Sequence, residues 1–98
     1  MISGELHDEA NAEVVEAAAY LENQRRGYGD RFIAAFEAAR EFVIDHPRSG
    51  RPEPFDVRSW PVRGFSYSIV YTLEGDDVFI IAVRHHRRET GYWRSRLR

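Results

Sequence analysis

The residues with the clearest chemical potential follow directly on an apolar run. Residues 78–83 are all apolar, as in a strand that is covered on both faces. The next five side chains are cationic or titratable: Arg84, His85, His86, Arg87 and Arg88. Guanidinium groups bind phosphate or carboxylate, and imidazoles transfer protons near neutral pH. We therefore expect a strand that leaves the core and presents these groups at one edge of a rigid sheet.

One reaction that such a set can perform is RNA cleavage by attack of the 2′-hydroxyl group. It needs a base, an acid and cations that stabilise the phosphorane. His86 can supply acid or base, and Tyr92 can stack on a nucleobase or assist proton transfer. Arg84 and Arg63 can hold the phosphate. The alternative is structural: a histidine can cap the core edge by hydrogen bonding, and the arginines can form a solvated rim.

Strand alternation separates the two histidines. It puts Arg84 and His86 on one face of the strand, and His85 and Arg87 on the other. Helices that cover one face would bury one histidine, and we expect His86 to be the exposed one. Further on, Tyr92 and Trp93 either pack the tail against the core or contact a protein or nucleic acid, since arginines flank them at 94 and 96.

The sequence offers little for a metal or a cofactor. The paired histidines have no third ligand at convincing spacing, because His7 and His46 are distant in the sequence. There is no cysteine, which removes disulfides, thiolate metal sites and cysteine nucleophiles. We expect no metal and no cofactor.

The length of 98 residues predicts a single domain spanning residues 1–98. No apolar run is long enough for a membrane span, and the first residues lack the features of a secretory signal. We expect a cytoplasmic protein with no membrane partner. The formal net charge of -2 conceals an asymmetry, because residues 1–47 hold 4 Arg and 10 Asp or Glu, whereas residues 48–98 hold 10 Arg and 6 Asp or Glu. The second half should form a basic face for an acidic partner or nucleic acid.

Periodicity predicts two helices followed by strands. Residues 9–25 form an amphipathic helix with Asp8 as N-cap, and a second helix follows Asp30 and ends before Pro47. Val14 and Val15 belong to the apolar side of the first helix. Residues 47–54 are rich in proline and glycine and form a loop.

Later residues alternate with a period of two, which predicts strands at 58–63, 66–73 and 78–86, and residues 5–7 can add a first strand. The expected fold is α+β, with two layers. An antiparallel β-sheet is covered on one face by an N-terminal αα-hairpin, in the order β-α-α-β-β-β.

Four strings in this order resemble the RelE/ParE superfamily of toxins from type II toxin–antitoxin modules. They are Arg-Phe-Ile-Ala-Ala-Phe at 31–36, His-Pro-Arg-Ser-Gly-Arg at 46–51, the segment 58–71, and the ending at 83–89. The resemblance covers almost the whole chain. It implies a growth-inhibiting toxin of the kind that stabilises plasmids. It also implies a cognate antitoxin whose disordered acidic tail wraps the toxin, and we expect that tail to pair with Arg84, Arg87 or Arg88.

Two branches of this superfamily differ in chemistry. RelE-like members cleave messenger RNA on the ribosome, whereas ParE-like members bind and poison DNA gyrase. The RelE pattern has an arginine where this chain has Ser68, although His86 and Tyr92 match two other RelE positions. Three features favour the ParE-like branch: the 46–51 loop, the segment 60–71, and the ending that contains His85, Arg88 and Glu89.

Three hypotheses therefore remain, with a ParE-like gyrase poison as the first. The second is a RelE-like ribonuclease that uses His86, Arg84 and Tyr92, and the third is a non-toxic interaction module of the same fold. The residues expected to bind the target or the antitoxin are Arg63, Arg84, His85, His86, Arg87, Arg88, Tyr92 and Trp93. The sequence is compatible with a homodimer or with a hetero-oligomer that includes the antitoxin.

Overall fold

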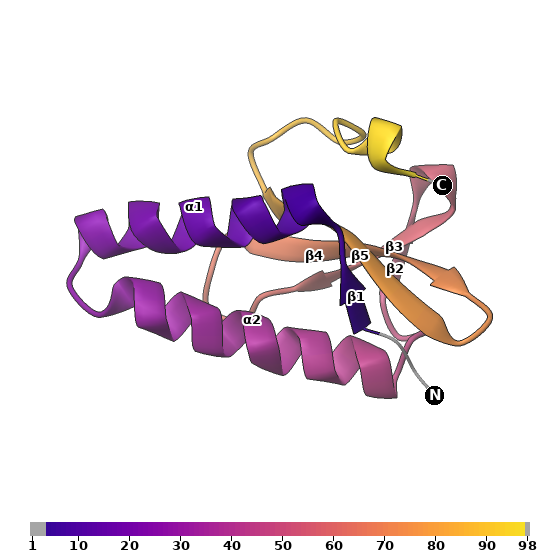
Figure 1. Ribbon diagram of the computed structural model, residues 1–98, viewed down its shortest axis with the longest axis horizontal. Helices are drawn as coiled ribbons and strands as arrows, with labels where there is room; N and C mark the ends of the chain where they lie inside the picture. The colour runs from indigo at the N-terminus through magenta and orange to yellow at the C-terminus, as the bar shows by residue number, and fades with distance from the viewer. Residues whose placement is uncertain (1–3, 98) are drawn as a thin grey trace.

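The computed structural model describes residues 4–97, which form a helical hairpin packed on a five-stranded sheet (Figure 1). The helices are α1 (Asp8–Gln24) and α2 (Tyr28–Asp45). The strands are β1 (Gly4–Leu6), β2 (Arg51–Glu53), β3 (Val57–Pro61), β4 (Tyr67–Glu74) and β5 (Asp77–His85). Two 3₁₀ turns, η1 (Pro54–Asp56) and η2 (Arg94–Arg96), complete the fold. None of the described helices is both long and apolar enough to cross a bilayer.

The predicted α+β class and the helical hairpin are confirmed, and the sheet adds detail. Its order is β1-β5-β4-β3-β2, and every neighbouring pair is antiparallel except β1 and β5, which are parallel. The loop predicted at 47–54 contains the short strand β2. Pro52 is tolerated there because β2 lies at the edge of the sheet, where one side of the strand needs no partner.

The helix starts differ from the prediction because other groups cap them. The His7 ring caps α1, since its Nδ1 accepts the Glu9 N–H at 3.1 Å, so the expected cap Asp8 is already inside the helix. Helix α2 begins two residues before Asp30, after Gly27 at φ 85°. The Glu22 carboxylate reaches across from α1 and accepts the N–H groups of Gly27 and Gly29.

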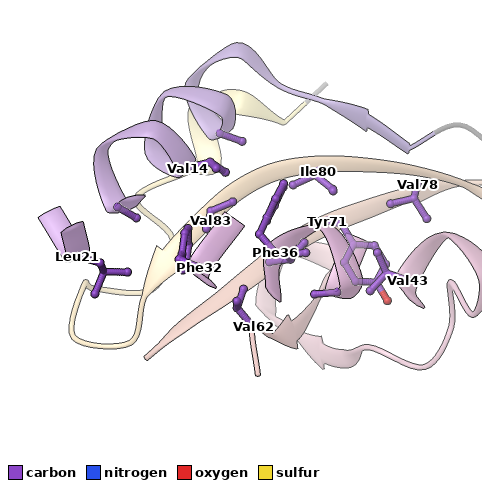
Figure 2. Close-up of a cluster of buried hydrophobic side chains, with 14 residues drawn as sticks. Val14, Leu21, Phe32, Phe36, Val43, Val62, Tyr71, Val78, Ile80 and Val83 are labelled. Carbon is purple, nitrogen blue, oxygen red and sulfur yellow. The ribbon is translucent and has the colours of Figure 1, made fainter. Parts of the chain in front are cut away.

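The main core lies between the helical hairpin and one face of the sheet (Figure 2). Phe32 and Phe36 of α2 pack there with Val14 and Leu21 of α1 and with aliphatic residues of β4 and β5. Val15, predicted on the apolar side of α1, is instead 60% exposed, because the buried stripe runs through Ala10, Val14, Ala17 and Leu21.

The other face of the sheet is also covered, by a segment that the two-layer prediction did not include. A second apolar cluster is formed by Val57, Val70, Phe79, Ile81, Ala82 and Trp93. Its cover is the C-terminal segment, which returns over the sheet after β5 (Figure 1). Strand β5 is therefore buried on both faces, as its unbroken apolar run predicted.

A bulge in β5 decides which way its last residues face. Tyr71 pairs with Ile80 and Val70 pairs with Ala82, so Ile81 has no partner on β4. As a result Ile81 and Ala82 both lie in the second cluster, and Val83 returns to the helix side. Every side chain after the bulge is reversed relative to simple alternation from Val78.

The conformation of the loop at residues 46–51, one of the four segments that resemble the RelE/ParE superfamily, is fixed by Tyr71. Its hydroxyl donates to the Pro47 carbonyl at 2.8 Å and accepts the Gly50 N–H at 3.1 Å. The Arg58 guanidinium donates to the carbonyls of Arg48 and Gly50. These residues hold β2 and its loop in place, so this string has a structural role in the fold.

Gly50→Ala should lower the free energy of unfolding by about 2–4 kcal/mol. A Cβ atom at Gly50 would collide with the Tyr71 hydroxyl and lie 2.8 Å from Cζ of the same ring. Urea denaturation measures the change, and Ser49→Ala, at an exposed position of the same loop, is the control and should change stability by under about 0.5 kcal/mol. Equal stability of the two variants would contradict this packing.

Candidate functional site

The candidate site is the turn that follows β5. The strand ends at His85, with Arg84 and His85 half-buried and His86, Arg87 and Arg88 exposed. The turn is anchored to the neighbouring β3–β4 turn, because the His86 N–H donates to the Ser66 carbonyl at 2.9 Å. The predicted emergence of these groups from a packed strand at one edge of the sheet is confirmed.

The two histidines face opposite sides. His85 lies beside α1, edge-on to the Tyr67 ring with a centroid distance of 4.9 Å, in a groove that Glu16, Ala17 and Tyr20 also line. His86 is exposed, and its Nε2 is 2.9 Å from the Ser68 hydroxyl. The expected exposure of His86 is confirmed, and the bulge at Ile81 is the reason, since it turns His85 toward the helices.

The His85 ring should titrate below free histidine. Its Nδ1 accepts the Arg87 N–H at 3.0 Å, so the neutral ring carries its proton on Nε2. Burial lowers the pKa of His85 from 6.5, and the charges of Arg87, His86 and Arg84 lower it further. A histidine whose pKa falls on folding binds a proton more weakly than in the unfolded chain. Stability contributed by neutral His85 is therefore lost as the pH falls through the range below 6.5.

Imidazole ¹⁵N chemical shifts recorded against pH test this directly. The His85 midpoint should lie below 6.5, and Arg87→Gln should move it upward by removing one of the three charges that oppose protonation. A His85 midpoint above 6.5 would contradict its placement.

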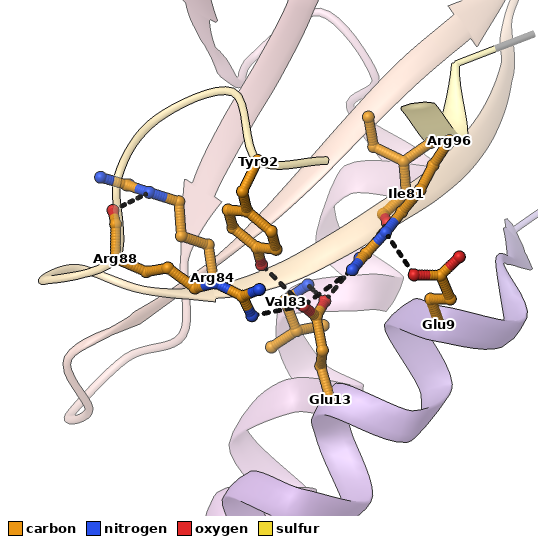
Figure 3. A network of polar contacts seen from close by, with 8 residues as sticks. All are labelled: Glu9, Glu13, Ile81, Val83, Arg84, Arg88, Tyr92 and Arg96. Carbon is orange, nitrogen blue, oxygen red and sulfur yellow. Dashed lines mark hydrogen bonds and ion pairs between the residues drawn. The ribbon is translucent and has the colours of Figure 1, made fainter. Parts of the chain in front are cut away.

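A network centred on Glu13 of α1 holds the chain that follows β5 (Figure 3). The Glu13 carboxylate accepts the Tyr92 hydroxyl at 2.8 Å, the Arg96 guanidinium at 2.9 Å and Arg88 at 3.3 Å. It also accepts the Val83 N–H at 3.0 Å. The Glu13 side chain is only 11% exposed and that of Arg96 7%, so this ion pair is largely desolvated.

This network completes the edge of β5. Strand β1 pairs with residues 78–80, and among residues 4–97 no strand lies beside the outer edge of β5 beyond Ile80. There Glu13 accepts the Val83 N–H, and Arg96 donates to the Ile81 carbonyl at 3.0 Å. Two paired side chains thus satisfy backbone groups that would otherwise be unpaired.

The Tyr92 side chain is bound within this network through its hydroxyl group, which donates to Glu13. Burial, followed by the hydrogen bond to Glu13 and the charge of Glu13, raises the pKa of its phenol. The Arg88 guanidinium stacks over its ring at 3.6 Å. Its hydroxyl proton is directed at Glu13, whereas His86 pairs with Ser68, so the hydrogen bonds of Tyr92 and His86 lead to different groups.

The interpretation that Trp93 packs the tail against the core is confirmed, and its inclusion among the residues that bind the target or the antitoxin is wrong. Trp93 is 1% exposed and lies in the second apolar cluster, with the Phe55 ring edge-on at 6.0 Å. The physical reason is that the far face of the sheet is apolar and needs a cover, which the large indole provides. Its Nε1 is buried without a hydrogen-bond partner among the described residues.

The candidate arginines differ in what they contact. Arg84 donates to the Arg88 carbonyl at 3.0 Å and lies 3.5 Å from the Thr90 hydroxyl, while the Arg88 guanidinium is paired with Glu13. Arg87 is exposed, and its guanidinium has no partner within residues 4–97. Arg63 is exposed on the β3–β4 turn and lines an apolar groove between α2 and β3.

Sequence reasoning missed Glu13 and Arg96. One signal for Glu13 existed, because it lies between Ala10 and Ala17 in the buried stripe of α1, where an unpaired charge would be costly. Nothing local marks Arg96, which depends on how the tail folds back. Within residues 4–97 no three His, Asp or Glu side chains converge as metal ligands would.

The model of the family described as the ParE toxin of the type II toxin–antitoxin system, parDE, matches residues 5–90. The chain belongs to the ParE toxin family. No curated protein matches it. The matched region of this ParE-family chain contains Glu13 and the basic turn after β5, and it ends before Tyr92, Trp93 and Arg96.

Proposed function

We propose that this ParE-family toxin inhibits growth by binding DNA gyrase in the cytoplasm, and that a cognate antitoxin neutralises it. Membership of the ParE family is the observation that carries the proposal. The surface offered to the target is the exposed turn after β5, where the His86 ring is accessible and the Arg87 guanidinium has no partner within residues 4–97.

The arrangement of side chains supports gyrase binding over RNA cleavage. A ribonuclease of this fold needs an acid, a base and a phosphate-binding cation around one scissile bond. At the RelE arginine position, Ser68 is 9% exposed and is opposite Arg84 in the β4–β5 ladder. The Tyr92 hydroxyl is engaged with Glu13, and the Arg84 guanidinium is engaged with its own loop.

The antitoxin contact should centre on Arg87. Of the three arginines expected to pair with an acidic tail, Arg84 and Arg88 already have partners within the toxin, and Arg87 has none among residues 4–97. The binding partner in this measurement would be an antitoxin encoded by a short reading frame immediately upstream of the toxin gene. Arg87→Ala should weaken its binding, and unchanged affinity after Ala substitution of all three arginines would contradict this contact.

Induction of the toxin without antitoxin tests the proposed target. Filamentation with DNA-damage signalling is expected, and Arg87→Glu should reduce the loss of viability by about tenfold or more, because reversing the charge at a binding contact should cost at least about 1.4 kcal/mol. Arg51→Glu is the matched control, because Arg51 is exposed on β2, away from the β5 turn. Rapid translation arrest would instead favour a RelE-like ribonuclease, and unhindered growth would refute the toxin proposal.

A further inference from the structure

Three turns meet toward one end of the molecule. Phe65 of the β3–β4 turn packs against Tyr28 and Phe32 at the start of α2, with ring centroids 5.1 and 5.3 Å apart. The turn after β5 is joined to the same β3–β4 turn by the hydrogen bond from His86 to Ser66. The α1–α2 turn lies at the left end in Figure 1, and the β4–β5 turn lies at the opposite end.

Five arginines on or beside these three turns have no partner in the part of the chain that the structure describes. They are Arg25, Arg26 and Arg31 around the α1–α2 turn, Arg63 on the β3–β4 turn, and Arg87 after β5. All five are exposed, and within residues 4–97 none has a hydrogen bond or an ion pair through its guanidinium group. By contrast, Arg48 at the other end pairs with Asp76 at 2.6 Å. We call these five residues the arginine tip.

Three acidic residues lie on or beside the same turns, Glu22, Asp30 and Glu89, so the five arginines leave a net positive charge there. Glu22, on the last turns of α1, has its carboxylate bound to the N–H groups of Gly27 and Gly29, which lower its pKa. The β4–β5 turn at the opposite end carries Asp76 and Asp77, preceded by Glu74. The net charge of -2 therefore combines a basic end and an acidic end, separated along a molecule that is 40 Å long.

We propose that the arginine tip binds the phosphate backbone of duplex DNA. Guanidinium groups form paired hydrogen bonds with phosphate oxygens and remain charged at any physiological pH. Sequence-independent contacts of this kind come from arginines spread along a surface, as they are on the three turns. The acidic end would point away from the DNA and orient the toxin on approach.

The five guanidinium groups are spread over three turns and do not line one groove, although Arg63 borders the apolar groove between α2 and β3. This spread favours DNA over an acidic peptide. A peptide that folds on binding needs apolar pockets for its side chains. The rings available here, Tyr28, Phe32 and Phe65, are packed on one another. The choice of duplex DNA, the substrate of gyrase, rests on the proposed function, whereas the phosphate chemistry does not.

Fluorescence anisotropy with a labelled duplex of about 20 base pairs tests the proposal over a range of salt concentrations. Wild-type protein should bind at low salt, and the logarithm of its affinity should fall linearly with log salt, by about 0.9 for each phosphate neutralised. Arg63→Gln/Arg87→Gln should weaken binding about tenfold or more and reduce the slope by about 1.8. Arg48→Gln/Arg51→Gln is the matched control, since it removes the same net charge from the opposite end, and it should bind within about twofold of wild type.

Any of three results would contradict DNA binding by the arginine tip. They are no binding of the duplex at low salt, equal losses of DNA affinity in the two double variants, or a loss of affinity only for an acidic antitoxin peptide. The same variants in a supercoiling assay separate this inference from the proposed function. Gyrase inhibition without DNA binding by the free toxin would contradict only the proposal that the arginine tip binds DNA. DNA binding without gyrase inhibition would support DNA binding by the arginine tip and would contradict the proposal that the toxin inhibits gyrase.

Discussion

Glu13→Ala will lower the free energy of unfolding by about 3–5 kcal/mol, because the buried Arg96 guanidinium keeps only its contact with the exposed Glu9 at 3.3 Å and two further donors lose their acceptor. The Arg96 side chain is only 7% exposed and loses its closest carboxylate. The Val83 N–H loses its acceptor at the edge of β5, and the Tyr92 hydroxyl loses its only hydrogen bond among residues 4–97. Each of these two groups is then a buried donor without an acceptor, and water reaches it too poorly to replace the lost hydrogen bond.

Urea denaturation followed by circular dichroism measures this change. Glu16→Ala is the control, because Glu16 is an exposed carboxylate three residues away on the same helix, and its effect should stay within about 0.5 kcal/mol. Amide exchange of Val83 should also accelerate in the Glu13 variant. A loss below about 1 kcal/mol would mean that the network is not desolvated in solution.

Trp93→Ala should cost about 3–5 kcal/mol, since it empties the largest fully buried position of the second cluster. Trp93→Phe should cost much less, about 1–2 kcal/mol, because phenylalanine keeps most of the apolar contact and removes a buried N–H that has no partner among the described residues. Thermal denaturation compares the two variants with Ser95→Ala, an exposed neighbour that should change little. If Trp93→Ala were neutral for stability but abolished target binding, the indole would be a surface contact after all.

Local sequence signals predicted most of the fold because periodicity and turn chemistry act over short distances. The spacing of Phe32, Phe36 and Val43 identified the buried side of α2, and the apolar run before Arg84 identified a strand covered on both faces. These signals need no knowledge of distant residues. The start of α2 was mistaken for the opposite reason, since Glu22 of another helix binds its first N–H groups, whereas the cap of α1 is His7, the residue next to the expected Asp8.

The candidate site was only partly predictable because long-range contacts decide which cations are free. The bulge at Ile81 turns His85 toward α1, and no residue type in β5 predicts this bulge. Arg88 and Arg87 are adjacent in the sequence, yet Arg88 pairs with a carboxylate 75 residues away and Arg87 has no partner within residues 4–97. Trp93 is buried because the far face of the sheet lacks another cover.

The supercoiling activity of purified DNA gyrase, measured with and without this toxin, tests the central claim most directly. The account predicts that wild-type toxin inhibits supercoiling at a concentration about tenfold lower than Arg87→Glu, a ratio that corresponds to about 1.4 kcal/mol of binding. Arg51→Glu should match wild type. Full supercoiling in the presence of excess folded toxin, with translation arrested in a parallel cell-free reaction, would contradict it.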